Sequence, residues 1–397
     1  MMKRFIYVFL CLIFFNCDYD KNRDLTVYVG YLKANDSIQI PFNFEIKDSK
    51  MIISNSKELV ELDVRNEFND SIKVLSPFFE DIIMYVDHID SLNGFYYNKS
   101  LDRKIPFFAK PGINRFSNNN KFKDFSGNWR VIFNHNDNNA FDAEMIINQN
   151  TQILEGTVRT ETGDYGFMQG ISNQNKISMS NFNGYRGYMI DGYLINDTIR
   201  GFLYRGNYDS KEFVAFKQKG FNLSDPYELT KIKKGYEKFI YNFKNTDGDL
   251  VSYDDQKFVG KVNIIQIMGS WCPNCLDESR YLSKLAKNFD EVSITSIAFE
   301  FAKSEEKALN NLKKLKKNLG IDYDILLAQY GSSNKEDAAE KLPSIDTIIS
   351  YPTLIVTDKN LKVRRIHTGF NGPATGIKYK NFIIEFENFI KTLINEG

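Results

Sequence analysis

Two cysteines three positions apart are the residues in this sequence with the clearest chemical potential. Cys272 and Cys275 follow a largely apolar stretch and enclose Pro273 and Asn274. Pro273 suits the first turn of a helix, where no backbone N–H is needed. At a helix N-terminus, unpaired N–H groups and the helix dipole lower the pKa of a thiol. We therefore predict that Cys272 is a nucleophile and that Cys275, one turn further on, resolves a mixed disulfide.

Metal binding and a purely structural disulfide are the alternatives for this pair. The other cysteines, Cys11 and Cys17, lie in the first segment, so the chain has no disulfide framework. A zinc site would need two more ligands. The chain has no second Cys-x-x-Cys, and its histidines are His88, His135 and His367. We predict a redox-active disulfide that needs no metal and no separate cofactor.

Alternating strands and helices are expected to position the two cysteines. Val262–Met268 is a continuous apolar run typical of a strand buried on both faces, and a helix is expected over Pro273–Phe289. The further strands expected are Tyr236–Phe243, Val292–Phe299, Asp324–Ala328, Thr353–Thr357 and Val363–His367, and the further helices are Glu305–Leu319, Lys335–Leu342 and Tyr379–Ile394. This order predicts an α/β fold with a central mixed sheet.

The chain before this region has the pattern of antiparallel β-structure. Short strands are expected at Leu25–Leu32, Ile38–Ile46 and Leu59–Val64, with a short helix at Pro77–Tyr85. Eight closely spaced strands are then expected at Gly127–Asn134, Ala140–Gln149, Ile153–Thr160, Tyr165–Ile171, Lys176–Phe182, Met189–Ile195, Thr198–Tyr204 and Glu212–Lys217. Such a meander predicts a small barrel or sandwich.

Taken together, these patterns predict a multidomain protein. The expected boundaries are a signal segment at 1–17, a β-rich region at 18–117, a barrel-like domain at 118–219, a Lys-rich connector at 220–237 that could form a helix, and an α/β domain at 238–397. The apolar fraction of 42% is enough to bury a core. Because 51 basic residues balance 51 acidic ones, no overall field favours nucleic acid as a partner.

The N-terminal segment has the features of an export signal. Lys3 and Arg4 precede an apolar run from Phe5 to Phe15, which is too short to cross a bilayer. The segment resembles a bacterial lipoprotein signal in which Cys17 becomes the acylated first residue. A plain cleaved signal peptide and an uncleaved anchor are the alternatives. All three predict a location in the cell envelope, facing the periplasm or held on the outer membrane by a lipid anchor.

Two segments of the C-terminal part carry a family resemblance. The first runs from Trp271 to Cys275, and the second is Tyr351-Pro352-Thr353, some 80 residues further on. Together they resemble the active site of the TlpA/ResA-like family of exported thioredoxin-fold disulfide reductases, over about residues 236–397. The resemblance implies a cis peptide bond before Pro352 and a substrate-binding surface. The residues it implies for that surface are Trp271, Pro273, Tyr351, Pro352 and Thr353.

Other positions distinguish this chain from thioredoxin itself. Thioredoxin has a buried Asp six residues before its first cysteine, where this chain has Gln266. The TlpA/ResA-like group has a Glu six residues after that cysteine, and Glu278 matches it. The resemblance implies that Glu278 deprotonates Cys275; a surface Glu favoured by the helix dipole is the alternative. Asp277 is interpreted as a helix-start charge, and His367 as a residue packed at a strand end.

Three functions follow as hypotheses. The first is an exported thiol–disulfide oxidoreductase, acting as a reductase on protein disulfides and re-reduced by a membrane thiol reductant. The second is a thiol peroxidase of the AhpC/TSA grouping. The Pro-x-x-x-Thr/Ser-x-x-Cys pattern of such enzymes is absent, because Ile265 and Gly269 occupy its positions. The third is a non-enzymatic envelope lipoprotein whose β-region binds a ligand.

Overall fold

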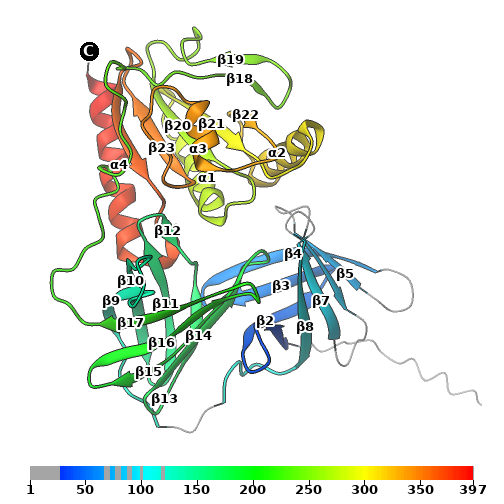
Figure 1. Ribbon diagram of the computed structural model, residues 1–397. Helices are drawn as coiled ribbons and strands as arrows, with labels where there is room; N and C mark the ends of the chain where they lie inside the picture. Colours follow the sequence, from blue (N-terminus) through cyan, green and yellow to red (C-terminus); the bar gives the residue numbers. More distant parts are fainter. Residues whose placement is uncertain are drawn as a thin grey trace, which may run out of the picture.

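The fold consists of two antiparallel β-barrels and a C-terminal α/β unit (Figure 1). The computed structural model describes residues 27–66, 72–76, 82–86, 92–98, 102–117 and 121–396 of the 397-residue chain. Antiparallel β-structure followed by an α/β fold is thus confirmed. Within the described ranges, no helix is both long enough and apolar enough to cross a membrane.

The first barrel is built from eight strands, each paired antiparallel with the next, and β8 pairs back with β1. The strands are β1 (Val27–Lys33), β2 (Gln39–Lys47), β3 (Lys50–Asn55), β4 (Glu58–Asn66), β5 (Ile72–Leu75), β6 (Ile82–Val86), β7 (Leu92–Asn98) and β8 (Arg103–Pro111). The three strands expected in this region correspond to β1, β2 and β4. Phe42, Phe44 and Phe107 fill the interior with mutually packed rings.

The helix expected at Pro77–Tyr85 is wrong where the structure describes it. Residues 82–86 form β6, which pairs with β5 on one side and β7 on the other. Its sequence, Ile-Ile-Met-Tyr-Val, is rich in β-branched and aromatic residues, which favour strands. Residues 77–81 lie outside the described part of the chain.

The second barrel is a closed meander, as the sequence predicted. Its pairings form a ring of eight strands, in which β17 returns to β9 and β10 pairs with β11. The strands are β9 (Gly127–Phe133), β10 (Phe141–Asn150), β11 (Ile153–Thr160), β13 (Met168–Asn173), β14 (Lys176–Phe182), β15 (Gly187–Ile195), β16 (Thr198–Arg205) and β17 (Asp209–Phe216).

One strand of this barrel differs from the expectation in a way that matters for the site. The strand expected at Tyr165–Ile171 begins only at Met168. Before it, the chain forms a two-residue strand, β12 (Gly163–Asp164), which pairs with the end of β11. Gly163 and Gly166 have φ values of 132° and 76°, which glycine adopts readily and which interrupt a regular strand. The β11–β12 turn therefore projects from the barrel.

The α/β unit has a seven-stranded sheet in the order β19-β18-β22-β21-β20-β23-β24. Its strands are β18 (Asn242–Asn245), β19 (Leu250–Ser252), β20 (Val262–Met268), β21 (Val292–Phe299), β22 (Asp324–Gln329), β23 (Thr353–Thr357) and β24 (Val363–Thr368). Its helices are α1 (Pro273–Ala286), α2 (Glu305–Leu319), α3 (Lys335–Glu340) and α4 (Ile377–Asn395), with a 3-10 turn at Pro373–Thr375. Strands β20, β21 and β22 are parallel, and β23 and β24 are antiparallel to their neighbours.

The central strand β20 is buried along its whole length, as its apolar sequence predicted. Val262 and Ile264 pack in a cluster with residues of α1 and α4, whereas Ile265 and Ile267 pack on the other face with residues of α2. Covering both faces fixes the carboxyl end of β20. The two cysteines follow immediately after that end.

The connector between the second barrel and the sheet is irregular chain with turns, rather than helix, over its fully described residues 220–237. It is held against the α/β unit: Lys233 N donates to Ser344 O at 2.9 Å, and Thr368 N donates to Pro226 O at 3.0 Å. The strand expected at Tyr236–Phe243 is also wrong over its first part, since β18 begins at Asn242. Residues 236–241, which are all described, make only an isolated bridge at Lys238.

Candidate active site

Cys272 and Cys275 form a disulfide at the N-terminus of α1, with Cα atoms 5.2 Å apart. Cys272 is the N-cap residue, and its Sγ accepts a hydrogen bond from Cys275 N at 3.2 Å. Cys275 is completely buried, whereas Cys272 retains 5% exposure and borders a cleft. Since backbone N–H groups point at Cys272 Sγ, the reduced form of this residue is placed to exist as a thiolate.

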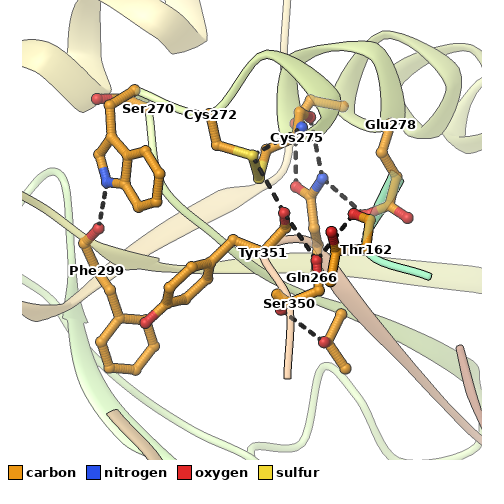
Figure 2. The surroundings of a disulfide bond; sticks show 12 residues. Thr162, Gln266, Ser270, Cys272, Cys275, Glu278, Phe299, Ser350 and Tyr351 are labelled. Carbon is orange, nitrogen blue, oxygen red and sulfur yellow. Dashed lines mark hydrogen bonds between the residues drawn. A yellow bond between two sulfur atoms is a disulfide. The ribbon is translucent and has the colours of Figure 1, made fainter. Parts of the chain in front are cut away.

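The loop before β23 faces the disulfide, as the family resemblance implied. The Tyr351–Pro352 peptide bond is cis. The carbonyl oxygen of Tyr351 lies 3.3 Å from Cys272 Sγ (Figure 2). Thr353 Oγ1 donates to Ser350 O at 2.8 Å. Strand β23 pairs directly with β20, so this loop is fixed relative to Cys272 by the sheet itself.

Trp271 forms one wall beside the disulfide. Its Nε1 donates to Phe299 O at 2.9 Å (Figure 2). Its ring packs edge-on against Tyr351, with centroids 5.5 Å apart, and lies 4.4 Å from the ring of Phe301. The structure therefore gathers Trp271, Cys272, Pro273 and Tyr351 along one cleft, with Cys275 buried behind them.

Glu278 is buried inside the domain and is not a surface residue. Gln266 Nε2 donates both to Glu278 Oε2 at 2.9 Å and to the backbone carbonyl oxygen of Cys275 at 3.2 Å, which links the carboxyl group to the backbone of Cys275 (Figure 2). Gln266 Oε1 in turn accepts from Ser279 and Ser296. Burial raises the pKa of Glu278 to about 8, although the hydrogen bond from Gln266 opposes this shift. The alternative of a surface Glu is thus excluded.

A second buried carboxyl group, Glu300, was missed by the sequence analysis. It follows β21 and accepts hydrogen bonds from Ser270 N and Ser270 Oγ, both at 2.7 Å. Burial raises its pKa to about 7. The sequence did contain a signal for this residue. Both β20 and β21 were expected, and the carboxyl ends of adjacent parallel strands lie at the same edge of a sheet. A polar residue directly after β21 therefore had to lie near Ser270.

The disulfide opens into a cleft of about 730 Å³ that all three parts of the molecule line. The first barrel contributes Glu58 and Leu59, and the second contributes Asp164 and Arg186. The sequence analysis missed these residues because they lie more than 80 positions before Cys272. No local pattern connects them with the cysteines.

Three carboxyl groups from the three parts lie near one another in this cleft. Burial, together with Asp277, raises the pKa of Glu58 to about 7 and that of Asp164 to about 6. Burial also raises the pKa of Asp277, although its ion pair with Arg280 at 2.6 Å opposes the shift. Asp277 is thus more than the simple helix-start charge expected from its position.

The remaining predicted residues lie away from this cluster. His367 is buried between Tyr227 and Phe382, and burial lowers its pKa to about 4, which fits the packing role that was expected. Cys17 lies outside the described residues. Among residues 27–396 with their gaps, no group of three or more His, Cys, Asp or Glu side chains could hold a metal ion.

A buried strand that ends at a helix N-terminus bearing Cys-x-x-Cys, opposite a cis-proline loop, defines a thioredoxin-fold thiol–disulfide oxidoreductase. Residues 234–380 match the family model described as Redoxin. The C-terminal unit thus has a thioredoxin-like α/β fold and is similar to the Redoxin family over these residues, which confirms the class predicted from the residues around Cys272 and Pro352.

Several solved structures are similar to part of the chain. A thiol-disulfide isomerase from Corynebacterium glutamicum is 14% identical, with 42% of this chain and 97% of that chain covered and a TM-score of 0.31. A thioredoxin family thiol:disulfide interchange protein from Chlorobium tepidum is 19% identical, with coverages of 42% and 100% and a TM-score of 0.29. The thioredoxin domain of a thiol-disulfide oxidoreductase from Bacteroides vulgatus is 20% identical, with coverages of 39% and 99% and a TM-score of 0.29. No curated protein matches the chain.

Proposed function

We propose that this protein is an exported thiol–disulfide oxidoreductase that reduces disulfides in protein substrates. The observation that carries the proposal is the asymmetry of the pair. Cys272 caps α1 and borders the cleft, whereas Cys275 is fully buried behind it. One thiol can therefore meet a substrate, and the other can react only with its neighbour.

The reaction proceeds in two exchanges. The thiolate of Cys272 attacks one sulfur of the substrate disulfide; that disulfide breaks, a mixed disulfide forms, and the first substrate sulfur leaves as a thiolate that takes up a proton. Cys275 then loses its proton, attacks Cys272 Sγ and releases the second substrate thiolate. The substrate gains two electrons, and the Cys272–Cys275 disulfide re-forms. A membrane thiol reductant restores the dithiol, and no other cofactor takes part.

Glu278 serves in this scheme as the base that accepts the proton of Cys275. Both residues lie on one face of α1, since they are three positions apart, and Gln266 bridges them. Trp271, Pro273 and Tyr351 line the cleft and form the surface on which an extended substrate backbone lies next to Cys272. Pro352 and Thr353, expected on that surface, are buried, and Thr353 instead holds the loop by donating to Ser350 O. The carbonyl group of Tyr351, close to Cys272 Sγ, supports this role.

Reduction of insulin disulfides tests the activity. Wild-type protein with a thiol reductant should accelerate insulin reduction, Cys272→Ser should abolish the acceleration, and Cys275→Ser should accumulate a mixed disulfide. A reduction potential near that of thioredoxin, about −270 mV, is expected of a reductase, whereas one near −120 mV would make the protein an oxidant. Insulin reduction that does not depend on Cys272 would contradict the proposal.

We further propose that Cys17 carries a lipid that holds the protein in the cell envelope, facing the periplasm or on the outer membrane. The support is the charged and apolar segment that ends at Cys17. Cells fed a labelled fatty acid should label the wild type and Cys11→Ser, which is the matched control. Cys17→Ser should lose both the label and its place in the membrane fraction, and persistent labelling of that variant would contradict the anchor.

The sequence-derived boundaries 18–117, 118–219, 220–237 and 238–397 are proposed as the limits of the structural units. The supporting observations are the irregular connector and the limits of the strands on either side of it. Proteolysis of the full chain should cut first near these limits, and earliest cuts inside either barrel would contradict them.

A further inference from the structure

Three segments of the α/β unit contact the same short segment of the second barrel. They are the first turn of α1, which carries Asn274, the loop before Pro352, and residues 369–372. The segment is residues 161–164, at the β11–β12 turn, which we call the cap segment. Ser350 Oγ donates to Thr162 O at 3.0 Å (Figure 2), and Gly372 N donates to Asp164 Oδ2 at 2.5 Å.

Glycines on both sides allow this contact to be very close. A Cβ atom at Gly163 would lie 2.0 Å from Asn274 Nδ2 and 2.9 Å from Phe370 O. A Cβ atom at Gly369 would lie 2.7 Å from Glu161 O. The backbone of the cap segment thus packs directly on the backbone of residues 369–372. The cap segment therefore occupies space beside Cys272 that a folded protein substrate would need.

The side of Cys272 that stays open is the cleft. Its far wall is the β3–β4 region of the first barrel, with Glu58, Leu59 and Glu61. Lys314 on α2 donates to Ser76 O of the first barrel at 3.1 Å, which fixes this wall against the α/β unit. A cleft of about 730 Å³ has the size of sites that enclose ligands or short chain segments.

We propose that the cap segment restricts the substrates of this enzyme to disulfides in flexible or short peptide chains and excludes disulfides embedded in folded domains. The inference rests on the proposed function and names its substrate class. A flexible chain enters the cleft and presents its disulfide to Cys272. A rigid domain meets the cap segment on one side and the first barrel on the other before its disulfide arrives.

The test compares substrates on the full-length protein. kcat/KM is measured for a flexible disulfide-bridged peptide, for a folded protein with a surface disulfide of matched potential, and for hydroxyethyl disulfide, which is small enough to ignore the cap. We expect the wild type to favour the peptide over the folded protein by about 100-fold. Equal efficiency on these two substrates would overturn the inference.

Gly163→Ala displaces the cap segment from Asn274 and Phe370 O. It should reduce the preference for the peptide about tenfold, while the rate with hydroxyethyl disulfide changes less than twofold. Gly248→Ala is the matched control, since Gly248 also has a positive φ, of 96°, but no atom lies within 4 Å of its added Cβ. Ser350→Ala, which adds no atom and removes the hydroxyl that donates to Thr162 O and to Tyr351 O, is a second variant. It should lower the preference for the peptide about threefold.

The outcomes separate the two proposals. Reduction of hydroxyethyl disulfide without dependence on Cys272 would overturn the proposed function, and this inference with it. Normal Cys272-dependent reduction, with a preference unchanged in Gly163→Ala and Ser350→Ala, would overturn only the role of the cap segment.

Discussion

At the scale of single residues, the proposed base Glu278 is distinguished by the burial of its carboxyl group. One of its oxygens accepts from Gln266, and the other, Oε1, is buried without a hydrogen-bond partner. A buried acid without a cationic partner holds its proton to unusually high pH. With a pKa of about 8, Glu278 is protonated at neutral pH and becomes a carboxylate, able to accept a proton from Cys275, as the pH rises.

We predict that Glu278→Gln slows the resolution of the mixed disulfide by about 10²-fold, the lower end of general-base effects. In the wild type this step should become faster as pH rises through about 8, because deprotonation creates the base. Glu278→Gln should lose that limb of the profile. Rapid-quench trapping of the mixed disulfide between pH 6 and 9 measures the step. Exposed Glu306→Gln on α2 is the control, and a pH profile that survives in Glu278→Gln would show that another group is the base.

At the scale of elements, the ends of two parallel strands are joined by a buried hydrogen-bond pair. Ser270, after β20, donates from both its backbone and its hydroxyl to Glu300, after β21. Ser270 directly precedes Trp271 and the cysteines. The pair therefore holds the turn that starts α1 against the neighbouring strand.

We predict that Ser270→Ala lowers the free energy of unfolding of the oxidised protein by about 1–3 kcal/mol, because one oxygen of a buried carboxyl group loses its donor. Urea denaturation of the oxidised protein measures the change. Ser293→Ala, at a half-buried position on β21, is the control and should cost less than about 0.5 kcal/mol. If both variants lose the same free energy of unfolding, the hydrogen bond from Ser270 to Glu300 does not stabilise the fold.

Elements with a strong periodic pattern could be predicted from sequence almost to the residue. Strands β20, β21 and β23 and helix α2 have the expected bounds, because apolar runs and helical spacing fix them locally. β6 and the start of β13 could not be predicted in the same way. β6 is a strand because it pairs with β5 and β7. The strand expected before Met168 is interrupted by Gly163 and Gly166, whose φ values are positive.

The same division applies to the site. The cysteines, Pro352 and Glu278 could be predicted because each belongs to a short sequence motif or lies at a fixed spacing from one. The structure brings these residues together. Glu58 and Asp164 approach Cys272 only through the packing of separate units, which no local pattern encodes.

At the scale of the whole molecule, each of the three structural units contributes one carboxyl group to the cleft. We call the three residues, Glu58, Asp164 and Asp277, the carboxyl junction. Glu58, Asp164 and Asp277 all have raised pKa values, with burial as the first cause. Folding therefore favours their protonated forms. Once they ionise, three negative charges face one another, and Arg280 compensates only part of them.

We predict that this junction weakens as pH rises. Folding raises the pKa of Glu58 from 4.5 to about 7, so the penalty for its ionisation develops between these values and is complete above pH 7. Tm should fall between pH 5.5 and pH 8, and Glu58→Gln should reduce that fall by about 2–4 °C, the shift typical of about 1 kcal/mol. Exposed Glu61→Gln on the same strand is the control. A fall that is identical in wild type and Glu58→Gln would contradict a role for the junction.

The contact between the cap segment and the 369–372 loop also has a consequence for the order of events during synthesis. Asp164 and Gly372 are 208 residues apart, and Thr162 and Ser350 are 188 residues apart. Loops of this length close late, because their ends must first find each other. A chain that emerges from its N-terminus completes the second barrel long before the partner loops exist. Cys272 and Cys275 therefore lack the contact between the cap segment and the loops beside them until the last 50 residues, which supply Ser350 and Gly372, have folded.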